Sequence, residues 1–133
     1  MKITKKYYFY AAHRNEKADV KCARLHGHTY HVTFELLFPD EGDIVMLFSD
    51  IDFVLEPIVK AFDHYLILHD EDPLYDLLQG AGEPFISVPW VTSAENLAKY
   101  FYREGKKRIS AVASVSIQET QSAIVTYEEA ISK

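Results

Sequence analysis

The chain has 133 residues, of which 48% are hydrophobic and 14% aromatic, and its formal net charge is −6. This composition excludes a disordered chain, and the length predicts one domain over residues 1–133 with a substantial core. The acidic balance makes nucleic acids and membrane surfaces poor candidates as partners. A single cysteine and an N-terminus without the apolar stretch of a signal peptide predict a cytoplasmic protein.

Alternating apolar residues predict two long strands near the N-terminus, over residues 2–13 and 26–38. In the first strand the odd-numbered residues share the mainly apolar face, and in the second strand the even-numbered residues do. Residues 39–43 combine proline, glycine and acidic residues, a pattern typical of a turn. We expect a further short strand over residues 44–48.

A first helix is predicted to follow Ser49, which has the character of an N-cap with Asp52 three residues later. Apolar residues recur at helical spacing over residues 51–62. Pro57 lies inside this run, so we expect a kink or an irregular first turn.

The remaining elements are a helix and two strands. Residues 69–91 contain several prolines and glycines and are expected to be irregular, with one short helix at most. A capping pattern at residues 92–95 predicts a second long helix that ends near residue 107. Two strands, over residues 109–119 and 122–127, complete a ββααββ order. This order favours an α+β domain whose antiparallel sheet carries helices on one face.

Three histidines have the spacing of a metal site. His26 and His28 share one face of their predicted strand about 6.5–7 Å apart, and His13 ends the apolar face of the other strand. Three neutral imidazoles with an open fourth position are typical of a catalytic zinc site. A lone histidine is more often an ordinary hydrogen-bonded residue, and we keep that interpretation for His31 and His69.

The only cysteine, Cys22, lies four residues before the first of the paired histidines. Its loop also carries Lys17, Lys21 and Arg24, whose positive charges would lower the pKa of the thiol and favour a reactive thiolate. The alternative is an inert, buried cysteine.

Three acid-base residues follow later in the chain. Asp63 and His64 end the first predicted helix, where the carboxylate could orient the imidazole for proton transfer. The pair is equally well explained by the preference for a cation at a helix C-terminus. Glu119 ends the apolar face of a strand and needs a partner if it is buried. The amide and amino edge of a pterin or guanine ring would provide one; simple exposure is the alternative.

Five segments together resemble the family of 6-pyruvoyltetrahydropterin and 6-carboxytetrahydropterin synthases. They are residues 9–14, 22–30, 62–64, 93–98 and 118–120, in the order expected for that family and spread over nearly the whole chain. The resemblance implies the tunnelling fold, a four-stranded antiparallel sheet with two helices between its second and third strands. It also implies homohexamers, in which trimers close their sheets into a barrel and two trimers stack.

The resemblance assigns the three histidines, His13, His26 and His28, as ligands of Zn²⁺. The substrate it implies is 7,8-dihydroneopterin triphosphate, whose side-chain hydroxyls the metal would hold.

The same resemblance gives roles to the remaining candidates. Cys22 would be the base that removes a proton from the substrate side chain, and Asp63 and His64 would form a relay that reaches the site across a subunit interface. Glu119 would anchor the pterin ring.

The product is not decided by these residues. A 6-carboxy-5,6,7,8-tetrahydropterin synthase on the route to queuosine is our first interpretation, and a 6-pyruvoyltetrahydropterin synthase is the alternative. More distant alternatives are a zinc hydratase-type enzyme and a non-catalytic pterin-binding protein. The chain departs from the family pattern at Leu47, at Thr92 and Ser93, and in a long loop over residues 65–94; these departures bear on the choice of substrate.

Overall fold

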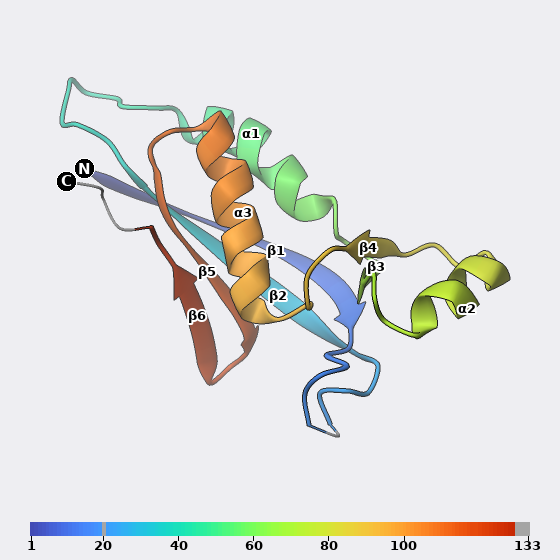
Figure 1. Cartoon of the computed structure of the whole chain (residues 1–133). Helices are drawn as coiled ribbons and strands as arrows, with labels where there is room; N and C mark the ends of the chain where they lie inside the picture. Colours follow the sequence, from blue (N-terminus) through green and yellow to red (C-terminus); the bar gives the residue numbers. More distant parts are fainter. Residues whose placement is uncertain (20, 130–133) are drawn as a thin grey trace.

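A six-stranded sheet organises the chain in the order β4-β3-β1-β2-β5-β6 (Figure 1). The computed structural model describes residues 1–19 and 21–129. The strands are β1 Lys2–His13, β2 His26–Leu37, β3 Tyr65–His69, β4 Ile86–Val88, β5 Val112–Thr120 and β6 Ala123–Tyr127. The helices are α1 Phe48–Lys60, α2 Leu74–Ala81 and α3 Ala94–Arg108. None of the helices among the described residues is long and apolar enough to cross a membrane.

Strands β1 and β2 form the backbone of the sheet. They pair antiparallel along their whole length, from Lys2 opposite Leu37 to His13 opposite His26. Because successive side chains of a strand point to opposite faces, the apolar residues of both strands lie on one face of the sheet, which is buried. Tyr8 and Tyr10 lie on the other face and are about half exposed. The faces predicted from the alternation are therefore the ones adopted.

Helices α1 and α3 cover the buried face of the sheet (Figure 1). At Gly105 of α3 a Cβ atom would lie 2.9 Å from the ring of Phe34, so the close approach of this helix to β2 depends on glycine. Helix α3 begins after Ser93, whose hydroxyl accepts a hydrogen bond from the Asn96 N–H at 3.2 Å. The core contains these fully buried residues: Phe9, Tyr30, Val32, Phe34, Leu36, Ile51, Leu55, Val59, Leu97, Phe101, Val112, Val115 and Ile117.

The expected ββααββ order is present in β1, β2, α1, α3, β5 and β6, whose four strands pair antiparallel. The expected strand over residues 44–48 is not formed. The N–H groups of Asp50 and Ile51 both bond to the Leu47 carbonyl, so the helix begins at Phe48 and Ser49 is not its cap. The helix continues through Pro57 to Lys60.

The segment expected to be irregular contains more regular structure than the sequence indicated. Strand β4 and the short helix α2 lie in it, and β4 pairs parallel with β3, which ends at His69, where the segment begins, and adds to the edge of β1. His69 ends β3 rather than lying in a loop, and its Nδ1 is 2.6 Å from the Glu16 carboxylate. A second buried contact joins Arg14 to Asp72, with Nε donating to Oδ2 at 2.7 Å. The start of the loop after β1 is thereby tied to the segment after β3.

Candidate active site

The three predicted metal ligands meet at the end of the β1–β2 ladder. His13 pairs with His26, and His28 pairs with Ala11, so all three imidazoles lie on the buried face. Their donor nitrogens lie within 4.8 Å of one another, the one such group among the described residues. The ring centroids are 4.7 Å apart for His13 and His26, 5.3 Å for His13 and His28, and 4.7 Å for His26 and His28. The strand register alone brings this cluster together.

Backbone carbonyls orient two of these imidazoles. The Nδ1 of His13 lies 2.8 Å from the Thr92 carbonyl oxygen, and the Nδ1 of His26 lies 2.6 Å from the Arg24 carbonyl oxygen. A carbonyl oxygen only accepts, so each Nδ1 carries the hydrogen and each Nε2 keeps its lone pair. The Nε2 of His13 is buried and has no protein partner in the described part of the chain. A metal ion would satisfy this atom, so these residues fit a metal site.

The surroundings of the cluster favour the neutral form of His13 and His28. Burial, and then the neighbouring His26 and His28, lower the pKa of His13 to about 4, although the bond to Thr92 opposes the shift. Burial, followed by His26, also lowers the pKa of His28. Neutral imidazole is the form that binds a metal, so the lowered pKa values of His13 and His28 suit both residues to that role.

Glu119 lies beside the cluster. Its Oε2 is 3.9 Å from the Nε2 of His28, and its side chain is one-quarter exposed. Burial, and then the negative charge of Glu95 in the first turn of α3, raise the pKa of Glu119. The sequence left open whether this carboxylate is simply exposed; it is instead partly buried next to the histidines.

Tyr30 is a residue of this site that the sequence indicated only as part of the core. Its ring stacks on Phe9 at 4.8 Å and lies edge-on to both His13, at 5.9 Å, and His28, at 5.5 Å. Burial, and then the charge of Glu119, raise the pKa of Tyr30, which stays protonated. Its hydroxyl is buried and has no hydrogen-bond partner among the residues described.

Cys22 lies in the exposed loop between β1 and β2. Its carbonyl accepts a hydrogen bond from the Asn15 N–H at 2.8 Å, and its own N–H donates to Asp19 Oδ1 at 3.1 Å. Hydrogen bonding to Asp19 raises the pKa of the thiol, and the negative charges of Asp19 and Glu119 add to the effect. The sequence predicted the opposite direction from the lysines and arginine of the loop. The prediction was wrong because Asp19 is the charge in contact with the thiol.

Asp63 and His64 form a pair, but on another side of the sheet. Asp63 accepts a hydrogen bond from the Tyr10 N–H at 2.8 Å, and its other oxygen is 2.9 Å from the Nδ1 of His64. His64 adopts a positive φ of 66°, its ring packs against Tyr10, and its side chain is 75% exposed. Among the residues described, no hydrogen bond or ion pair joins this pair to Cys22 or to the three histidines. Within one chain the pair is therefore not bonded to the cluster, although His64 and His28 both line one hollow of about 490 Å³.

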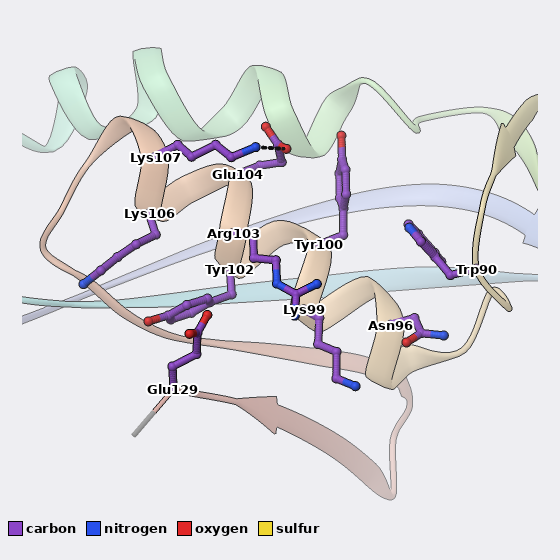
Figure 2. A pocket seen from close by; sticks show the side chains of 10 residues that line it. All are labelled: Trp90, Asn96, Lys99, Tyr100, Tyr102, Arg103, Glu104, Lys106, Lys107 and Glu129. Carbon is purple, nitrogen blue, oxygen red and sulfur yellow. Dashed lines mark hydrogen bonds and ion pairs between the residues drawn. The ribbon is translucent and has the colours of Figure 1, made fainter. Parts of the chain in front are cut away.

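A hollow of about 550 Å³ runs along α3 (Figure 2). Lys99 and Arg103 of α3 line it together with Trp90 and Tyr102, and Glu129 lies near Tyr102. It includes none of the site residues predicted from the sequence. A second hollow, of about 560 Å³, has His28 and Glu119 in its lining, so the candidate site also lies at a concave part of the surface.

Known proteins resemble this chain over nearly its whole length. The model of the family described as 6-pyruvoyl tetrahydropterin synthase matches residues 2–130. A 6-carboxy-5,6,7,8-tetrahydropterin synthase from Aquifex aeolicus is 31% identical to this chain over 96% of its length and 97% of the relative's. One of the same name from Haemophilus influenzae is 30% identical, over 96% and 99%.

Solved structures agree on the fold. An uncharacterized protein from Wolinella succinogenes superposes with a TM-score of 0.84 at 21% identity, over 98% of each chain. The 6-pyruvoyl tetrahydropterin synthase of Caenorhabditis elegans superposes with a TM-score of 0.70 at 24% identity, over 98% of this chain and 96% of that one. The tunnelling fold expected from the sequence is thus confirmed, with β3, β4 and α2 in addition to the predicted elements. The match of one family model to nearly the whole chain shows that the protein belongs to the 6-pyruvoyl tetrahydropterin synthase family.

Proposed function

We propose that the protein is a zinc-dependent 6-carboxy-5,6,7,8-tetrahydropterin synthase, a cytoplasmic lyase that acts on 7,8-dihydroneopterin triphosphate on the route to queuosine. The observation that carries this proposal is the cluster of His13, His26 and His28 with Glu119 beside it. Relatives that bear this name match the chain end to end at about 30% identity. Single-domain organisation over residues 1–133 is part of the same proposal.

The three histidines would hold Zn²⁺ through nitrogen atoms, with the fourth position left for substrate oxygen. When bound, the ion would supply Lewis acidity that polarises the side-chain hydroxyls of the substrate and makes the adjacent C–H bonds more acidic. Thr92 and the Arg24 carbonyl would keep two imidazoles in the ligating tautomer, as their hydrogen bonds to Nδ1 already do. This part of the site is preorganised within one chain.

The remaining residues would bind the pterin and move protons. Glu119 would accept hydrogen bonds from the amide and amino edge of the ring, which suits a carboxylate that pairs with no lysine or arginine among the described residues. Cys22 would accept the proton from the substrate side chain as a thiolate. Asp63 would hold the His64 imidazole in one tautomer through the 2.9 Å contact, and His64 would relay the proton.

Assembly would bring the relay to the cluster. The sheet ends in β4 on one side and β6 on the other, so both outer strands present backbone groups that a neighbouring chain could pair. The exposed His64 side chain would then enter the site of an adjacent subunit, in a hexamer made of two trimers. Such an arrangement accounts for the separation of Asp63 and His64 from the histidines within one chain.

Mixed oligomers test this arrangement. Cys22→Ala and His64→Ala variants should each be nearly inactive, but co-expression in equal amounts should restore about one quarter of wild-type activity, because a random site combines one intact Cys22 with one intact His64 in that proportion. Separately purified variants mixed without subunit exchange are the control. If the co-expressed mixture stays inactive while its mass shows mixed oligomers, both residues act from the same chain.

The product distinguishes the two synthases. We expect mass spectrometry of reactions with 7,8-dihydroneopterin triphosphate to show 6-carboxy-5,6,7,8-tetrahydropterin, together with acetaldehyde and triphosphate. The 6-pyruvoyl alternative is favoured by the description of the matching family. Accumulation of the pyruvoyl compound without acetaldehyde would establish that alternative instead.

A further inference from the structure

The hydroxyl of Tyr30 is a buried polar group beside the histidine cluster that the proposed chemistry leaves unexplained. Tyr30 is fully buried, and its hydroxyl has no hydrogen-bond partner among the described residues. A buried hydroxyl without a partner lowers stability, so native proteins rarely keep one unless it has another use. Phenylalanine would provide the same ring for the core without this cost.

A second buried tyrosine shows what an ordinary structural hydroxyl looks like in this chain. Tyr7 lies on the same buried face, nearer the other end of β1, and its hydroxyl donates to Asp52 Oδ1 at 2.7 Å. That aspartate is also 2.9 Å from the Nζ of Lys5. The Tyr7 hydroxyl is thus satisfied by a protein group, whereas the Tyr30 hydroxyl is not.

The surroundings of Tyr30 fix its ring at the edge of the histidine cluster. Phe9 stacks on one side of the ring with an interplanar angle of 10°, which holds its orientation. The rings of His13 and His28 lie edge-on at 5.9 and 5.5 Å. The buried Nε2 of His13 is likewise without a protein partner. Two neighbouring rings, those of Tyr30 and His13, therefore each carry a buried polar atom without a partner among the described residues.

We propose that the Tyr30 hydroxyl donates a hydrogen bond to a side-chain oxygen of the ligand held between the three histidines and Glu119. The inference rests on the proposed pterin-binding function and adds a binding residue to it. Its chemistry complements Glu119: the carboxylate accepts from the N–H edge of the ring, and the phenol donates to an oxygen at the other end of the ligand. Because the ring is held by Phe9, little side-chain freedom is lost on binding.

Two ligands and two variants test this role. Zinc-loaded oligomers of the wild type, Tyr30→Phe and Tyr7→Phe are titrated with 7,8-dihydroneopterin, which has side-chain hydroxyls, and with 6-methyl-7,8-dihydropterin, which has none. We expect Tyr30→Phe to weaken binding of the first ligand by about 5- to 20-fold and to leave binding of the second unchanged, as the loss of one hydrogen bond requires. Tyr7→Phe should bind both ligands as the wild type does.

The melting temperature of the ligand-free protein supplies a readout independent of binding. Tyr30→Phe should melt at or above the wild-type temperature, because it removes an unsatisfied hydroxyl, whereas Tyr7→Phe should melt lower. A Tyr30→Phe variant that melts lower and binds both pterins like the wild type would show a purely structural hydroxyl and overturn the proposal. If the wild type itself binds neither pterin, the proposed function fails, and that result is distinct from a failure at Tyr30.

Discussion

The Cys22→Ala variant should turn over 7,8-dihydroneopterin triphosphate about 100- to 10,000-fold more slowly than the wild type, the range lost when a general base is removed. Its zinc content and melting temperature should not change, because Cys22 is exposed and removal of its thiol leaves no cavity. Steady-state kinetics, metal analysis and thermal unfolding of the same preparation measure all three quantities. The thiol is the one proposed proton acceptor in the loop between β1 and β2.

Asp19→Asn is the matched control for this variant. It keeps the thiol but removes the carboxylate that raises the pKa of Cys22, so the thiolate should form at lower pH. Alkylation of Cys22 by iodoacetamide should then be faster at neutral pH, and turnover should persist. A zinc hydratase-type enzyme, in which three histidines activate water, predicts full activity in Cys22→Ala. Retained turnover in that variant would therefore favour the hydratase over the synthase.

Replacement of any one of His13, His26 and His28 by alanine should lower bound zinc from about one ion per chain to near zero and abolish turnover, since two imidazoles hold zinc too weakly. The three donors gather in one place, so each loss should have a similar effect. Elemental analysis after dialysis against a weak chelator gives the stoichiometry.

His31→Ala is the control for the metal experiment. His31 lies on β2 as His26 and His28 do, but it points to the opposite, exposed face. It should retain full zinc and full turnover. Loss of zinc in the control, or a full complement of zinc in a variant of the cluster, would contradict the assignment of the ligands.

The sequence indicated the elements whose signals are local. The alternation in β1 and β2 sets which residues are buried, and it predicted both strands within one residue of their observed ends. Ser93 marked the start of α3 because capping involves only the adjacent turn. Strands β3 and β4 were not predicted, because strands of five and three residues gain their stability from parallel partners far along the chain. The turn-rich composition between them indicated only irregularity.

The clustering of the three histidines could be predicted for the same reason. Side chains alternate between the two faces of a strand, so the sequence shows which histidines share a face. Antiparallel pairing of the two neighbouring strands then puts His13 opposite His26. The partners of these imidazoles could not be predicted: Thr92, whose carbonyl faces the Nδ1 of His13, lies 79 residues away. The same holds for the unsatisfied hydroxyl of Tyr30, which in the sequence is one more aromatic residue of the core.

The sequence by itself determined which residues share a strand face, and hence the three histidines and the Glu119 carboxylate of the candidate site. It indicated Cys22 by its position four residues before His26. Only the tertiary structure decided the directions of the pKa shifts of these groups and the residues with which they form hydrogen bonds. Asp19 rather than the basic residues of its loop sets the direction of the Cys22 pKa shift, and the Asp63–His64 pair lies apart from the cluster within one chain. The physical reason is that faces depend on a backbone repeat encoded locally, whereas electrostatic and hydrogen-bond energies depend on distances of a few ångströms, which the packed chain alone sets.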